Sequence, residues 1–149
     1  MSADRMDRGR PAVLVVEDSD DDFDTVLEAA TRARVSHRLI RAADAEAAQS
    51  LLARDAVGAF AFMLLDYNLP GLDGLAFLST VRRDPALAEL PVVIYTTSVN
   101  PRDRDAFLLA GANAFHPKSV QHADCLRTLE SIFDHWLIRA VPPPDGPAA

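Results

Sequence analysis

The chain has 149 residues, 49% of them hydrophobic, which is enough for one folded domain with a buried core and too short for two domains of ordinary size. Its 22 acidic and 15 basic residues give a net charge of -7, which opposes binding to nucleic acid or to anionic lipid. Cys125 is the single cysteine, so neither an internal disulfide nor a multi-cysteine metal site can form. No apolar run is long enough to span a membrane, and the first ten residues lack the apolar stretch of a secretory signal, so we expect a cytoplasmic protein.

Short apolar stretches alternate with amphipathic ones along the chain. We expect residues 1–10 to be a disordered lead, residues 11–139 to form the domain, and the proline-rich residues 140–149 to extend from it. The expected strands are 12–16, 37–41, 60–65, 92–95 and 113–116. The first expected helix begins near residue 19 or 20, and the other four cover 44–54, 75–83, 102–110 and 123–139. Five strands alternating with five helices predict an α/β fold with an all-parallel sheet and right-handed crossovers.

Polar residues follow four of the expected strands at the point where each strand ends. Glu17 and Asp18 follow the first strand, and Asp66 follows the third. Thr96 follows the fourth strand, and Lys118 follows the fifth. Ligands of an open parallel sheet bind in the crevice outside the carboxyl ends of its strands. The sequence therefore predicts that these side chains converge on one rim of the sheet.

Asp66 begins a segment, residues 67–74, that is rich in asparagine, proline, glycine and aspartate. These are the ordinary turn residues, so Asp66 on its own could simply begin a turn. Glu17 and Asp18 change this interpretation, because three carboxylates packed together repel one another unless a cation neutralises them. Magnesium is the natural candidate, since it prefers hard oxygen ligands and is commonly held by one or two carboxylates together with a phosphate.

Lys118 is the only lysine of the chain, beside fourteen arginines. A lysine is usually a solvated surface residue, and a threonine such as Thr96 can simply end a strand. Their positions after the fourth and fifth strands nevertheless favour a role beside the carboxylates.

Four sequence blocks lie at the ends of alternating expected strands. They are VVED at 15–18, LDYNLPGLDG at 65–74, LPVVIYTT at 90–97 and FHPK at 115–118. Together they resemble the receiver domain of two-component response regulators, and their order makes accidental agreement improbable. The resemblance runs from about residue 12 to 139 and implies a doubly wound, flavodoxin-like sheet with the strand order 2-1-3-4-5.

The resemblance also implies a role for each acidic residue. Asp66 would be the phosphoacceptor, which takes a phosphoryl group from a histidine kinase in a reaction that requires Mg2+. Asp18 would be the principal metal carboxylate, Glu17 its partner acting mainly through water, and the backbone carbonyl of Asn68 a further ligand. Such a protein is not an independent enzyme, because it promotes only its own phosphorylation and dephosphorylation.

Lys118 and Thr96 would contact the oxygens of the phosphoryl group. In the family this threonine moves toward the phosphoryl group and an aromatic residue of the fifth strand, here Phe115, turns inward. Since Phe115 lacks the hydroxyl group of a tyrosine, any such switch would act through packing alone. Receivers usually place a proline directly after the lysine, often with a cis peptide bond, whereas here Ser119 follows and Pro117 precedes.

Segments 96–98, 118–119 and 133–137, with prolines beyond, further resemble the small response regulators paired with phytochrome-type histidine kinases. This resemblance implies a phytochrome-type kinase as phosphodonor and a homodimer built on the last helix. Trp136, Leu137 and Ile138 lie beyond the length that a receiver needs and would expose apolar surface unless another copy covered them. We therefore expect dimer contacts there, with the downstream protein partner left open.

Two other functions remain open at this point. Phosphatases of the haloacid dehalogenase class also form an aspartyl phosphate with magnesium, but they carry a general-acid aspartate two residues after the nucleophile, where this chain has Asn68. A pseudo-receiver would keep the fold as a binding module without phosphorylation. The presence of the acids, Thr96 and Lys118 makes the pseudo-receiver the weaker interpretation.

Overall fold

A five-stranded parallel sheet forms the centre of the molecule in a computed structural model that describes residues 10–54, 58–66, 74–97 and 100–139. The strand order is β2-β1-β3-β4-β5, as predicted. The strands are β1 (Ala12–Val16), β2 (Leu39–Ala42), β3 (Phe60–Leu65), β4 (Val92–Thr96) and β5 (Ala114–Pro117). Each lies within about two residues of its expected position, because buried parallel strands are continuous apolar runs that the sequence displays directly.

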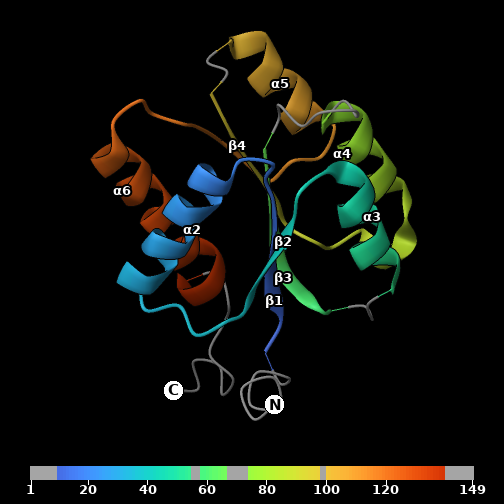
Figure 1. The fold of residues 1–149 in the computed structure, drawn as a ribbon. Coiled ribbons are helices and arrows are strands. Elements are labelled where there is room, and N and C mark those ends of the chain that lie inside the picture. The colour runs from blue at the N-terminus through green and yellow to red at the C-terminus, as the bar shows by residue number, and fades with distance from the viewer. Residues whose placement is uncertain (1–9, 55–57, 67–73, 98–99, 140–149) are drawn as a thin grey trace, which may run out of the picture.

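Helices cover both faces of the sheet (Figure 1). They are α2 (Asp20–Arg32), α3 (Ala45–Arg54), α4 (Gly74–Arg83), α5 (Pro101–Leu109) and α6 (His122–Phe133), with a short 3-10 turn, η1 (Pro85–Leu87), after α4. Helices α2 and α6 lie on one face, and α3, α4 and α5 lie on the other (Figure 1). The fold is thus doubly wound, and the direction of the connections changes between β1 and β3.

Alternate residues of the central strands fill two separate cores. Leu14 and Val16 of β1 point toward α3, α4 and α5, whereas Val13 and Val15 point toward α2 and α6. All four side chains are at most 1% exposed. Burial on both faces fixes the register of the strands, because a slip by one residue would exchange the two core faces.

The last helix differs from the sequence prediction, which expected one helix over 123–139. After α6 the chain continues as a π-helical segment, η2 (Asp134–Arg139), whose turns are wider than those of an α-helix. Leu137 is only 7% exposed and packs in the core beneath α2 and α6. The expectation that Leu137 exposes apolar surface is therefore wrong. Trp136 is half-buried against the same core, and the side chain of Ile138 lies outside the described part of the chain.

Among the described helices, none combines the length and the apolar character needed to cross a membrane. The segments predicted as lead and tail fall within residues 1–10 and 140–149, and all of these except Arg10 lie outside the described residues. Their conformation stays a prediction.

Candidate functional site

The predicted polar residues come together at the carboxyl ends of the strands. The backbone N–H of Asp66 donates to the carbonyl of Val16 at 3.1 Å, which places the start of the segment after β3 beside the end of β1. The backbone N–H of Lys118 donates to the carbonyl of Thr96 at 2.5 Å, which joins the ends of β4 and β5 in the same way. Glu17, Asp66 and Thr96 are buried polar residues, with exposures of 3%, 6% and 0%.

The ammonium group of Lys118 lies among three carboxylates. Its Nζ atom is 2.8 Å from Asp22 Oδ2, 3.0 Å from Glu17 Oε1 and 3.3 Å from Asp66 Oδ2. The lysine side chain is only 8% exposed, and Nζ lies 5.4 Å from the centroid of the Tyr95 ring, within cation–π range. The single lysine of the chain thus carries the positive charge at the centre of this site.

Helix α2 brings Asp22 into this cluster. Ser19 caps the helix, since its hydroxyl oxygen accepts from the backbone N–H of Asp22 at 3.2 Å, and its own N–H donates to Glu17 Oε2 at 3.2 Å. Three acidic residues, Asp20 to Asp22, occupy the first turn, where negative charge is favoured by the helix dipole. Asp22 is the one of the three whose carboxylate bonds to Lys118.

Burial and neighbouring charges shift the pKa values of Glu17 and Lys118. Burial and the neighbouring Asp66 raise the pKa of Glu17 from 4.5 to about 7, although Lys118 opposes the shift. Burial alone would lower the pKa of Lys118, but the hydrogen bond that the ammonium donates to Asp22 and the charges of Asp66 and Glu17 raise it above its ordinary value. The lysine therefore stays charged, while one of its carboxylate partners is partly protonated near neutral pH.

Carboxylate oxygens of Glu17, Asp22 and Asp66 all lie within 4.8 Å of one another, close enough to share a cation. Oxygen donors of this kind suit a hard divalent cation such as Mg2+. Asp18, which the sequence predicted as the principal metal carboxylate, is exposed and does not belong to this group of three carboxylates. Asn68, whose carbonyl was predicted as a further ligand, lies outside the described residues.

The two predicted switch residues lie on neighbouring strands. Thr96 ends β4 with no exposed surface, and Phe115 on β5 is half-buried, with its ring centroid 6.2 Å from that of Phe107 in α5. The lysine is followed by a trans peptide bond, since no cis peptide bond occurs in the part of the chain that the structure describes. The ring contact shows that Phe115 packs against helix α5.

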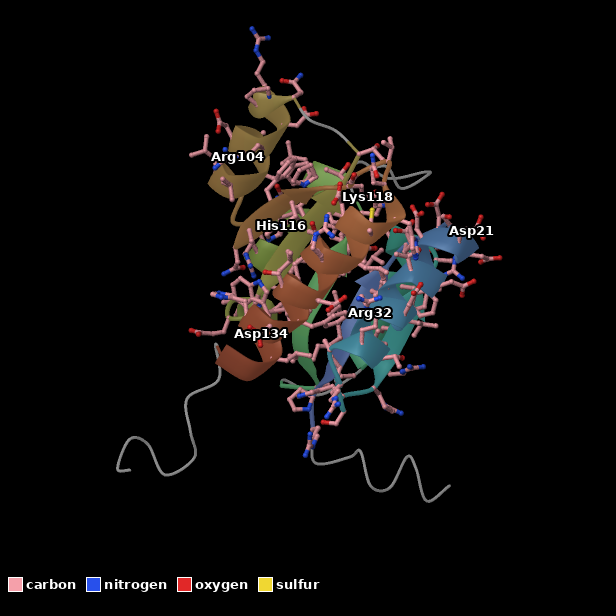
Figure 2. All side chains as sticks on the ribbon, turned by 90° about the vertical axis from the view of Figure 1, so that its left-hand side faces the viewer. Asp21, Arg32, Arg104, His116, Lys118 and Asp134 are labelled. Atoms are coloured by element: carbon pink, nitrogen blue, oxygen red, sulfur yellow. The ribbon has the colours of Figure 1, made fainter. Side chains whose placement is uncertain are left out.

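A groove of about 320 Å³ runs between β5 and the end of α6. Its lining includes His116, His135 and Trp136. The rings of His135 and Trp136, both in η2, make an edge-to-face contact with 4.7 Å between their centroids. Burial and the nearby charge of His135 lower the pKa of His116. Figure 2 shows His116 on the side of the molecule that faces away from α3, on the same face as α6. Trp136 therefore forms part of a surface beside the outermost strand of the sheet.

Sequence reasoning missed Asp22. Its signal is present, because an acid four residues after Asp18 and one turn into a capped helix can reach the strand ends. However, Asp20 and Asp21 offer the same chemistry, and only the phase of the helix selects Asp22. This selection depends on how α2 packs on the sheet.

The comparison with protein families identifies the chain. The model of the response regulator receiver domain matches residues 13–130, and the chain therefore belongs to that family. Response regulator Rcp1 of Synechocystis sp. is 33% identical over 131 residues, which cover 84% of this chain and 88% of that protein.

Solved structures agree with this assignment. The phosphorylated cyanobacterial phytochrome response regulator RcpA has a TM-score of 0.81 and 28% identity, covering 89% of this chain and 97% of that one. The Mn(2+)-bound form of Rcp1 also has a TM-score of 0.81, with 31% identity over 89% of this chain and 99% of that one. The chain is thus a receiver domain related to phytochrome response regulators.

Proposed function

We propose that the chain is a phosphoacceptor switch that receives a phosphoryl group on Asp66 from a histidine kinase and signals through altered protein contacts. The observation that carries this proposal is the buried carboxylate of Asp66, 6% exposed at the end of β3, with Lys118 Nζ at 3.3 Å. An aspartate is already ionised near neutral pH, so it needs no base to activate it.

The chemistry is a transfer of one phosphoryl group. An oxygen of Asp66 attacks phosphorus, a new O–P bond forms, and the bond from phosphorus to the donor nitrogen or oxygen breaks, with the electron pair leaving on the donor. Lys118 and the hydroxyl of Thr96 stabilise the charge on the phosphoryl oxygens. Hydrolysis by water later returns the free carboxylate and inorganic phosphate.

A divalent cation fits the acidic end of the site. Glu17 and Asp18, adjacent at the end of β1, would hold Mg2+ together with Asp66 and the carbonyl of Asn68. When bound, the cation supplies positive charge to the phosphoryl oxygens. The oxygen donors present and the Mn(2+)-bound structure of Rcp1 support this part of the proposal.

The test is intact-mass measurement after acetyl phosphate and Mg2+ are added. We expect one added phosphoryl group in the wild type, none in Asp66→Asn, and one in the control Asp24→Asn, which changes an exposed aspartate of α2. Labelling that persists in Asp66→Asn would refute the site. A wild type that remains unlabelled would favour a pseudo-receiver, which binds partners without phosphorylation.

The proposed partner is a phytochrome-type histidine kinase in the cytoplasm, and the relatives named in connection with phytochromes support this choice. The charge of -7 argues against a nucleic acid as the direct target. Transfer from an autophosphorylated phytochrome-type kinase should be faster than transfer from an unrelated kinase. Equal rates from both kinases would refute the pairing.

The proposed output is a homodimer that uses the groove beside β5 and Trp136. The free edge of β5 and the half-buried indole support such a contact, whereas the core position of Leu137 removes that residue from the interface. Light scattering of the wild type and of Trp136→Ala, with and without a phosphoryl mimic, tests this. A wild type that is monomeric at high concentration in both states would refute it.

A further inference from the structure

The hydrogen bonds of Lys118 are fully used in the structure. An ammonium group has three N–H donors and no acceptor. Three carboxylates lie within hydrogen-bond distance of Nζ, one each from Glu17, Asp22 and Asp66. A phosphoryl oxygen can therefore gain a hydrogen bond from this ammonium only if one of the three carboxylates gives its own up.

The three partners differ in how readily they can be released. The side chain of Glu17 is 3% exposed, so releasing it would cost a buried carboxylate its ion pair with Lys118. Asp66 loses its own carboxylate charge when it is modified, and its contact of 3.3 Å is the longest of the three, so it can free one donor of the ammonium. Any further donor must come from Asp22. The side chain of Asp22 is 46% exposed, and water can take over its hydrogen bond. Asp22 also lies on a helix, apart from the strand ends that form the rest of the site.

We propose that Asp22 is a positioning residue that holds Lys118 in the unphosphorylated protein and is exchanged for a phosphoryl oxygen when Asp66 is modified. This inference rests on the proposed function. Asp22 makes the shortest of the three contacts, 2.8 Å, so it competes directly with the phosphoryl group for the ammonium. Its negative charge also repels the phosphoryl oxygens, so both effects have the same sign: removing Asp22 favours the modified state.

The same carboxylate could instead serve as a cation ligand, since it belongs to the group of acids that lie within 4.8 Å of one another. The two roles predict opposite results. A ligand contributes to the binding of Mg2+ and of any phosphoryl mimic that needs it, so its loss weakens both. A partner of Lys118 that competes with the mimic strengthens mimic binding when it is lost.

The experiment measures the affinity of fluoroberyllate, a phosphoryl mimic, in the presence of Mg2+ for three proteins. They are the wild type, Asp22→Asn and Asp21→Asn. Asp21 is a matched control, because it occupies the same first turn of α2, is exposed, and loses the same charge on substitution. Figure 2 shows Asp21 and Lys118 near the same end of the molecule, so long-range effects of the lost charge are comparable.

We expect Asp22→Asn to bind fluoroberyllate about fivefold more tightly than the wild type, which is the size expected for a half-exposed charged contact. Asp21→Asn should bind within about twofold of the wild type. Equal affinities for the two variants, or weaker binding by Asp22→Asn, would overturn the inference. A wild type that does not bind the mimic at all would refute the proposed function itself and the inference with it.

A second measurement follows Lys118 directly in the protein without metal or mimic. Selective ¹⁵N labelling of lysine gives one side-chain ammonium signal, since the chain has a single lysine. We expect this signal to shift and its protons to exchange faster with water in Asp22→Asn, and to stay unchanged in Asp21→Asn. An unchanged signal in Asp22→Asn would show that the contact does not hold the lysine, and would overturn the inference.

Discussion

Replacing Glu17 by glutamine tests the electrostatics of the site in the protein without metal. Burial and Asp66 raise the pKa of Glu17 from 4.5 to about 7, so the folded protein binds this proton more tightly than the unfolded chain does. The folded state therefore loses stability as the pH rises from about 4.5 to about 7, and the loss is complete above that range. At roughly 1.4 kcal/mol for each tenfold change in proton affinity, the loss amounts to about 3 kcal/mol. The Glu17→Gln variant should not show this loss of stability, because glutamine cannot ionise.

The assay is urea unfolding in EDTA from pH 4.5 to 8, followed by the fluorescence of Trp136, the only tryptophan. The difference in the free energy of unfolding between wild type and Glu17→Gln isolates this residue, because all other titrating groups are common to both proteins. Glu89→Gln, which changes an exposed glutamate, should follow the wild type at every pH. A difference between wild type and Glu17→Gln that does not change with pH would refute the reasoning.

Three further predictions concern Lys118, the binding of Mg2+ and the hydrogen bonds of Arg82. Lys118→Met should lower the free energy of unfolding by about 3 kcal/mol at pH 8, because the buried carboxylates lose the ammonium group beside them. Adding Asp66→Asn should restore part of the lost free energy. A double variant as unstable as Lys118→Met alone would contradict this explanation. Mg2+ at about 100 times its dissociation constant should raise the free energy of unfolding of the wild type by about 2.7 kcal/mol. Asp18→Asn should reduce that gain, and an unchanged gain would remove Asp18 from the metal site. Arg82 donates hydrogen bonds to three acceptors outside its own helix, so Arg82→Ala should lower the free energy of unfolding in urea by about 2 kcal/mol. Arg83 is exposed, and Arg83→Ala should change this free energy little. Equal effects of the two substitutions would contradict the prediction.

The strands and the main residues of the site could be predicted because both depend on local patterns. Short apolar runs such as those of β1 and β3 are typical of buried strands. The topology rule brings the residues that follow the strands, Glu17, Asp66 and Lys118, to one rim. The partner from α2 could not be predicted, since three consecutive acids differ only in the direction that the packed helix gives them.

The prediction of a single helix that continues beyond α6 was wrong for a related reason. Ile132, Phe133, Trp136 and Leu137 have a spacing that suits both an α-helix and a widened turn. In the structure a π-helical segment follows Phe133, and Leu137 lies in the core. Backbone hydrogen bonding over one turn, rather than the apolar pattern, decides between the two, and the sequence does not display it.

The charge balance of the site bears on the proposed phosphorylation, in which one lysine would serve both the resting and the modified protein. Three carboxylates face one ammonium, so the cluster holds up to two excess negative charges, and partial protonation of Glu17 reduces that excess near neutral pH. Phosphorylation of Asp66 would replace a single negative charge by roughly two. Lys118 cannot offset this addition while its three donors stay on carboxylates. In the proposed mechanism a divalent cation would balance the added charge, and release of Asp22 would free a further donor of the ammonium for a phosphoryl oxygen.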